Sequence, residues 1–521
     1  MPGALRPILL AAALALVPTT AAGAAAAGPA GGAAEQASGS APSRSACRAT
    51  RAGSTAPPLR SFSSRPGGVR VFAMQFKQEA RHVTSYASFR RKIECMVREY
   101  VLPHRSRRVP NVVAFNEDVG LLTPGIGSRG ARARATAAPG GAPQCAGQDL
   151  CATIATLTAL DSGYTREIGF YRARFGAGVK DNSAALLGAT DTSVRAWVRT
   201  FSDLARRYRV YILGSSALPP FRESTDPAEI DALRDPDLPR PRSVFVATAP
   251  EVYNEAIMWG PRDVRRSGPG PLRNAVQRNR KVPLTGIELA LQFAPGPATG
   301  PEAVANVRPY RIPGSRARTS FATSLPAFRY GDPPPGVDPC SDTAQYYMRC
   351  LDRLGTNLVM QDEANPGRWA NVATDSYWQP LNWMGSTWRA ASDPSVDFDY
   401  NVTPHMVGNL ADLPFDGQTA ITQRGLGAGR PAPRGCKYVG NATAQPGDSD
   451  QDRPYAGAKR EFLALVPWVR PDGSRDALRA IAAKLAAGSG DPLENDYLET
   501  AAIADLPYPP DPRRRQLCPR R

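Results

Sequence analysis

An apolar strand pattern, a helical pattern and a second strand pattern follow one another early in the chain. VRVFAMQF begins at Val69 as a β-rich run, and the apolar residues of 85–100 then recur at helical spacing. VPNVVAF (109–115) has the composition of a buried strand, and the same alternation returns over 194–213 and 243–259. Because strands and helices alternate at this spacing, the sequence predicts a layered α/β domain.

The ends of the chain differ from this central part. Residues 1–27 combine a positive charge, a short apolar run and small residues, which is typical of a secretory signal peptide. Residues 28–68 are Ala, Gly, Ser, Pro and Arg without periodicity, which predicts a disordered linker. No later apolar stretch reaches the ~20 residues that a membrane span needs. We therefore expect a secreted protein with one domain over 69–510 and a basic tail over 511–521.

The chain is strongly basic, with 64 Lys+Arg against 47 Asp+Glu and a formal charge of +17. Such a charge is typical of proteins with polyanionic partners. The arginines, however, are spread along the whole chain, and no basic stripe interleaved with aromatics occurs. The composition therefore favours solvated surface arginines and no nucleic-acid partner.

Cysteine and histidine positions limit the metal chemistry. In an oxidising compartment most cysteines should pair, and Cys145 with Cys151 is the best local pair, while Cys436 with Cys518 is a candidate pair for the C-terminal end. Spacing alone leaves the connectivity open. No CxxC pair occurs and the chain has 3 His, so we expect no metal and no cofactor. The cysteines are Cys47, Cys95, Cys145, Cys151, Cys340, Cys350, Cys436 and Cys518.

Chemically competent side chains follow the predicted strands. Glu117 comes after VVAF, Lys281 and Glu288 lie in RNRKVPLTGIE, and Cys340 stands ahead of an amphipathic helix. Taken singly, each has an ordinary interpretation: a solvated loop carboxylate, a surface lysine and half of a disulfide. Side chains at the carboxyl ends of strands in an α/β sheet gather at one edge, where active sites tend to lie.

Three segments in this order resemble the nitrilase, or carbon–nitrogen hydrolase, superfamily: VVAFNED, KVPLTGIE and CSD, followed by RCLDRLGTNLVMQDEANPGRW. The resemblance implies a four-layer α-β-β-α sandwich. The chain departs from the family pattern through insertions near 120–190, 293–335 and 430–495.

The resemblance also implies roles for the site residues. Cys340 would attack as a thiolate, Glu117 would act as general base and then acid, and Lys281 would stabilise the oxyanion. Glu288 would orient Lys281 or the water, and Asp342 would cap the helix. Cys340 should then be unpaired, with the Glu117 carboxylate within about 4 Å of its sulfur or one water away.

The sequence thus predicts an exported thiol hydrolase that cleaves a small-molecule amide or nitrile, and the resemblance implies a homodimer. Two alternatives remain open: a non-catalytic extracellular binding protein on the same fold, and an acyltransferase that passes the thioester to an amine. A papain-like enzyme that pairs Cys340 with His405 would give Glu117 and Lys281 no role.

Overall fold

The computed structural model describes residues 41–51, 54–63, 65–138, 140–145, 151–239, 241–366, 380–428, 461–469 and 497–517. The predicted signal peptide, the candidate pair Cys436–Cys518 and most of the segment near 430–495 lie outside these ranges. Among the described residues, no helix is both long and apolar enough to cross a membrane.

The larger of the two main sheets has ten strands, with three parallel strands at its centre. The central strands are β3 (Val69–Lys77), β4 (Asn111–Ala114) and β5 (Tyr211–Leu218). β5 pairs with β8, and β8 with β9, both in antiparallel fashion. On its other side, β3 pairs with antiparallel β18. The remaining strands are β1 (Ser54–Thr55), β2 (Leu59–Ser61), β8 (Tyr253–Trp259), β9 (Ala275–Arg280), β14 (Met406–Leu410), β15 (Leu413–Asp416) and β18 (Leu498–Leu506).

The second sheet has six strands and also contains three parallel neighbours. These are β11 (Arg318–Phe321), β12 (Leu358–Met360) and β13 (Tyr400–Thr403). The flanking strands are β10 (Tyr310–Arg311), β16 (Ala420–Gln423) and β17 (Phe462–Leu465), and β6 (Phe221–Ser224) with β7 (Val244–Ala247) forms a separate pair.

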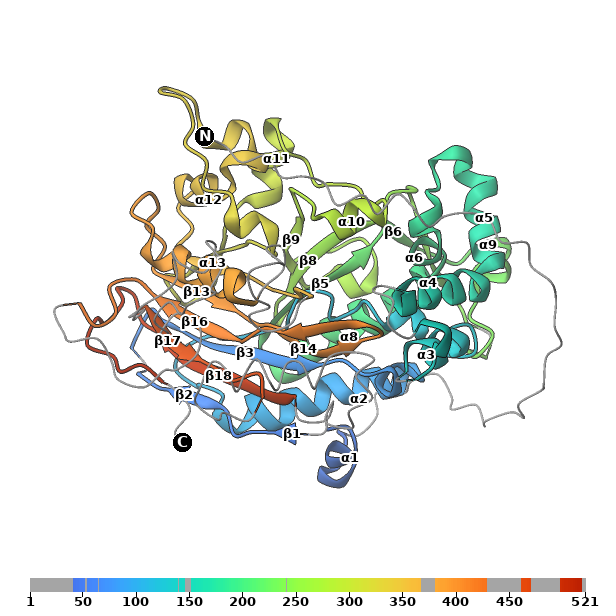
Figure 1. The fold of residues 1–521 in the computed structure, drawn as a ribbon, viewed down its shortest axis with the longest axis horizontal. Helices are drawn as coiled ribbons and strands as arrows, with labels where there is room; N and C mark the ends of the chain where they lie inside the picture. Colours follow the sequence, from blue (N-terminus) through green and yellow to red (C-terminus); the bar gives the residue numbers. More distant parts are fainter. Residues whose placement is uncertain are drawn as a thin grey trace.

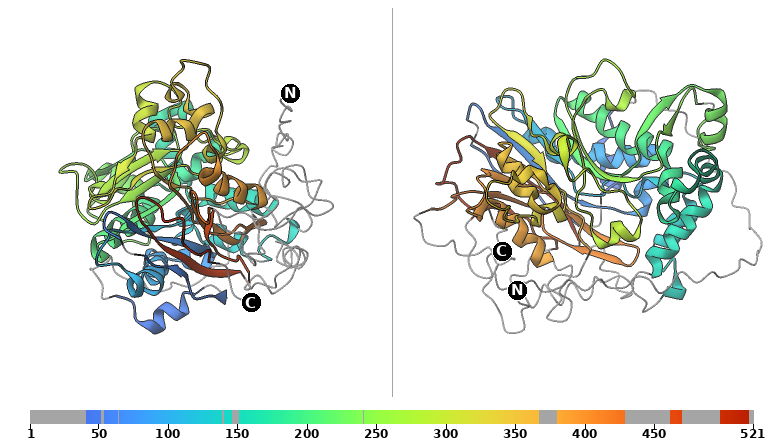
Figure 2. Two further views of the ribbon diagram at one scale, coloured as in Figure 1. Left: turned by 90° about the vertical axis from the view of Figure 1, so that its left-hand side faces the viewer. Right: turned by 90° about the horizontal axis from the view of Figure 1, so that it is seen from above.

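Helices lie on both sides of these strands and at one end. Figure 1 shows α2 on one side of the strands and α12 and α13 on the other, an arrangement that Figure 2 repeats from a second direction. α3, α4, α5, α6 and α9 gather at the right-hand end in Figure 1. The helices are α1 (Arg44–Ala49), α2 (Tyr86–Met96), α3 (Ala131–Ala137), α4 (Cys151–Gly163), α5 (Thr165–Phe175), α6 (Ala184–Gly188), α7 (Thr190–Ser193), α8 (Arg199–Tyr208), α9 (Pro227–Leu233), α10 (Gly286–Ala290), α11 (Gly300–Val307), α12 (Thr343–Arg353) and α13 (Pro380–Ser392).

The core follows from the alternation of side chains along each strand. Val71 of β3 belongs to a cluster that also contains Leu358 of β12, so the two sheets share one apolar interior. Phe72, the next residue of β3, packs instead in a cluster with Ile93 of α2. Val359 of β12 likewise belongs to a cluster formed with α12 and α13. The mixed α/β architecture that the sequence predicts is confirmed.

The expectation of a disordered linker over 28–68 is wrong for the part that the structure describes. Residues 44–49 form α1, and β1 and β2 pair in parallel with β18. Cys47 of α1 is joined to Cys95 of α2 by a disulfide. Composition could not reveal this order, because its partner strand lies at the opposite end of the chain.

A buried ion pair joins α2 to β18 and provides a test of how these elements hold together. Lys92 and Glu499 pair with side chains only 1% and 2% exposed. Replacing Lys92 by Met leaves the buried Glu499 carboxylate without its partner charge. We therefore expect a loss of about 3–5 kcal/mol in the free energy of unfolding, measured in urea. K92M/E499Q removes both charges and should recover much of that loss. Equal stability of the single and double variants would contradict this account.

Candidate active site

A buried lysine lies between two glutamates where strands of the larger sheet end. Glu117 follows β4, Lys281 directly follows β9, and Glu288 lies in α10. Lys281 Nζ is 2.7 Å from Glu117 Oε1 and 3.0 Å from Glu288 Oε2. The three side chains are 2%, 3% and 9% exposed, in the order Lys281, Glu117, Glu288. The structure therefore brings together three of the four predicted site residues.

Neighbouring polar groups hold both carboxylates in place. Asn254 of β8 donates through Nδ2 to Glu117 Oε1 and to Glu288 Oε1, each at 2.7 Å. The Thr285 N–H and hydroxyl donate to Glu288 Oε2 at 2.8 Å, as part of the capping box that begins α10. The Ala364 N–H, which follows β12 of the second sheet, donates to Glu117 Oε2 at 3.1 Å. Glu117 therefore links the two sheets.

The burial of this cluster changes its proton affinities. Burial alone would lower the pKa of Lys281, but the Glu117 and Glu288 carboxylates outweigh it and raise that pKa above its ordinary value. Burial raises the pKa of Glu117 to about 7, against the pull of the Lys281 ammonium. Burial would also raise the pKa of Glu288, yet the Lys281 charge and the Thr285 N–H hold it below its ordinary value. Glu117 is thus the member able to exchange a proton near neutral pH.

A serine in a strained conformation follows a strand of the second sheet. Ser324 follows β11 and has φ 60° and ψ −116°, a left-handed φ that a side chain rarely adopts. It is 1% exposed, and its Oγ donates to Asn365 Oδ1 at 3.3 Å. The adjacent Thr323 donates through Oγ1 to Asp362 Oδ1 at 2.8 Å, and Ser215 of β5 also bonds to Asp362. These contacts fix the turn, and such strain is concentrated at functional sites.

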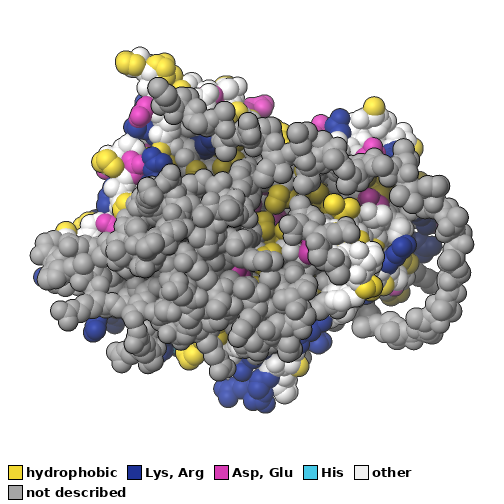
Figure 3. Space-filling view, in the orientation of Figure 1, with side chains coloured by type: hydrophobic (Ala, Val, Ile, Leu, Met, Phe, Trp, Pro, Cys, Tyr) yellow, Lys and Arg dark blue, Asp and Glu magenta, His cyan; other side chains and the backbone are white. Residues whose placement is uncertain are grey.

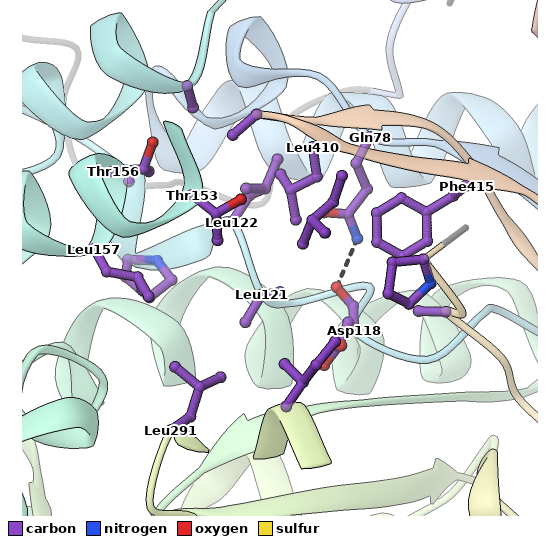
Figure 4. A pocket seen from close by; sticks show the side chains of 18 of the residues that line it. Gln78, Asp118, Leu121, Leu122, Thr153, Thr156, Leu157, Leu291, Leu410 and Phe415 are labelled. Carbon is purple, nitrogen blue, oxygen red and sulfur yellow. Dashed lines mark hydrogen bonds between the residues drawn. The ribbon is translucent and has the colours of Figure 1, made fainter. Parts of the chain in front are cut away.

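Glu117, Lys281, Glu288 and Ser324 line one pocket with a volume of about 220 Å³. Figure 4 shows part of its wall, where Gln78 donates to the main-chain oxygen of Asp118. A nucleophilic residue on a sharp turn after a strand is the geometry of a nucleophile elbow. The sequence interpretation missed Ser324, because nothing in SFATSLPAF encodes its backbone strain and the segment fell within the expected insertion near 293–335.

Cys340 does not belong to this pocket, and the expectation that it is a free thiol is wrong. It forms a disulfide with Cys350 of α12, and no cysteine of the described residues is free. A disulfide sulfur cannot supply the thiolate that attack on an amide requires. The preceding strand ends at Phe321, so the strand end itself carries Ser324 and not Cys340. Cys340 is also absent from the pocket wall beside Glu117, where it was expected.

Two smaller expectations concern Asp342 and His405. Asp342 accepts the Ala344 N–H at 2.9 Å, so its role as a helix cap is confirmed. His405 is fully buried, and burial lowers its pKa to about 4. Its Nδ1 donates to Met406 O, and its Nε2 lies 3.4 Å from Asn365 Nδ2. His405 therefore supports the residue that holds Ser324, and a papain-like pair with Cys340 is excluded by the disulfide.

The other cysteines of the described residues also pair. Cys145 and Cys151 form a disulfide, as the sequence predicted. The described residues contain no group of three or more His, Cys, Asp and Glu side chains that could hold a metal ion.

No protein-family model matches the chain, and no curated protein sequence matches it. Solved structures of an amidase from Nesterenkonia sp. AN1, described as a member of the nitrilase superfamily, are similar to it. A mutant with acrylamide added at its active-site cysteine is 10% identical, over 68% of this chain and 85% of that one, with a TM-score of 0.32. A mutant in complex with butyramide is 12% identical, over 70% and 86%, with a TM-score of 0.34.

The cysteine assignments can be tested by peptide mapping. Without reductant, iodoacetamide should leave Cys340 unlabelled, and proteolysis should yield a peptide pair that links it to Cys350. After reduction under denaturing conditions, both residues should become labelled. Labelling of Cys340 in the native, unreduced protein would contradict the structure.

Proposed function

We propose that the protein hydrolyses the carbon–nitrogen bond of an amide, with Ser324 as the nucleophile. The observation that carries the proposal is that Ser324, on its strained turn, lines the same pocket as the buried Glu117–Lys281–Glu288 cluster. A hydroxyl is a weak nucleophile unless a neighbouring base accepts its proton. The ordered motifs resemble carbon–nitrogen hydrolases, which is why we propose an amide as substrate.

The reaction has two halves. Ser324 Oγ attacks the amide carbon while its proton passes to Glu117, and the carbonyl oxygen becomes an oxyanion. The carbon–nitrogen bond then breaks as Glu117 returns the proton to the leaving amine, which leaves an ester on Ser324. A water then gives a proton to Glu117 and attacks the ester. The carbon–oxygen bond to Ser324 breaks as Glu117 returns that proton to Ser324 Oγ, and the acid departs. The hydrogen bond from Ser324 to Asn365 must be exchanged on substrate binding.

Lys281 is the group best placed to stabilise the oxyanion. Its ammonium has three N–H donors, and the Glu117 and Glu288 carboxylates account for two of them. The third is available for a substrate oxygen in a buried site, where such a charge is most effective. Glu288, which stays ionised, orients the ammonium.

We also propose that the fold is the four-layer α-β-β-α sandwich of this superfamily and that the protein acts outside the cytosol. The shared core of the two sheets, with α2 and α12 packed on their outer faces, supports the layering. The disulfides support an oxidising compartment. If an amine instead of water attacks the ester on Ser324, the protein is an acyltransferase. If Ser324 does not react at all, the protein is a binding protein on the same fold.

The nucleophile is tested by Ser324→Ala, which should remain folded and lose turnover by on the order of 10⁴ or more. Intact-mass analysis of the wild type during turnover should detect an acyl adduct that maps to Ser324. Ser341→Ala is the matched control, because it alters a serine beside Cys340, where the sequence placed the nucleophile. Wild-type turnover by Ser324→Ala would overturn the proposal.

The pKa of Glu117 sets the expected pH profile. Glu117 accepts a proton only when ionised, so kcat/KM should level off above about pH 7 and fall about tenfold per unit below it. The negative charge of Glu288 raises that pKa, so Glu288→Gln should move the midpoint to lower pH while reducing the rate. A midpoint that stays in place in Glu288→Gln would show that another group titrates.

A further inference from the structure

The pocket beside the catalytic cluster has a mostly apolar wall that extends well beyond the reacting groups. Leu157 and Leu160 come from α4, Leu291 from the end of α10, and Leu410 and Phe415 from the β14–β15 hairpin. Figure 4 shows these elements around the cavity, with Asp118 on one side and Leu157 on another. In the space-filling view, apolar side chains reach the surface near the middle of the face (Figure 3).

Several of these leucines are only partly buried, although they line a cavity and not an open surface. Leu121, Leu122, Leu157, Leu291 and Leu410 all have intermediate exposure. Apolar side chains left in contact with a cavity mark a site for an apolar ligand group, because covering them removes their surface from water.

The charges of the pocket either belong to the catalytic cluster or are engaged by the protein itself. Arg134 donates to the main-chain oxygen of Gly127 at 2.8 Å. Glu79 lies 3.2 Å from Lys77. Burial raises the pKa of Asp118 well above its ordinary value. Arg134 and Glu79 are thus engaged by the protein itself, and Asp118 directly follows Glu117 at the reacting end of the pocket.

The two walls of the apolar part are tied together. Asp412, in the turn of the β14–β15 hairpin, accepts the N–H groups of Ala152 and Thr153 at 2.9 and 3.1 Å and so caps the start of α4. The Cys145–Cys151 disulfide fixes the same helix end. The apolar space is thus a built feature of the fold.

We propose that the acyl group of the substrate is an apolar chain of medium length, bound between α4 and the β14–β15 hairpin. This inference rests on the proposed function for the placement of the amide carbon. The amide lies at Ser324, Glu117 and Lys281, and the chain runs along the leucines toward Leu157. Small hydrophilic amides occupy only the reacting end.

Binding can be measured apart from turnover by using Ser324→Ala in calorimetric titrations with primary amides from butyramide to octanamide. Each added methylene should tighten the Kd by about fourfold until the pocket is filled. Leu157→Trp, made in the Ser324→Ala background, fills the far end and should weaken octanamide at least tenfold while leaving butyramide unchanged.

The matched control is Ile154→Trp, which lies one turn earlier on α4, is 48% exposed and does not line the pocket. It should bind both amides like its parent, and thermal melting should show that both tryptophan variants are folded. If the Kd falls with chain length while the wild-type protein hydrolyses none of these amides, the acyl pocket is upheld and the hydrolase proposal is overturned. Affinity that is independent of chain length, or an equal effect of both tryptophans, would overturn the pocket.

Discussion

The buried ammonium of Lys281 is the interaction on which the site depends. Its charge allows Glu117 and Glu288 to lie together out of water, where two carboxylates alone would repel each other and one would be neutralised. Because Glu117 also accepts the Ala364 N–H, the same charge helps to hold the end of β12 against the end of β4. An uncompensated buried charge costs several kcal/mol, so loss of any member affects the geometry of the whole edge.

The proposed catalytic groups and the apolar wall of the pocket come from different parts of the chain. Glu117 and Ser324 follow the parallel strands β4 and β11, which are paired on both sides, and Lys281 follows the edge strand β9. The apolar wall instead comes from α4, α10 and a hairpin, which connect or extend the strands. Since strand ends are fixed by many hydrogen bonds, the connecting segments can differ between proteins without moving the catalytic groups.

The sequence predicted those features that local patterns encode. The period-two and helical patterns correctly gave β3, β4, α2 and α12, and the order of Glu117, Lys281 and Glu288 correctly indicated one cluster. Cys340 was misassigned because disulfide partners depend on distances in space, and its partner Cys350 lies in α12, the helix that begins just after Cys340. Ser324 was missed because a left-handed serine is imposed by contacts with Asn365 and its neighbours. No local pattern records such contacts.

The pairing of β18 with β3 has a consequence for biosynthesis. β3 begins at Val69, whereas the strand that covers its outer edge begins at Leu498. During synthesis the nascent chain therefore presents an unpaired β3 edge until β18 has been made, and an unpaired edge is prone to join other strands. β1 and β2 must wait as well, because both pair with β18. The larger sheet is thus completed only after β18 has been made, and products truncated before β18 should be prone to aggregation.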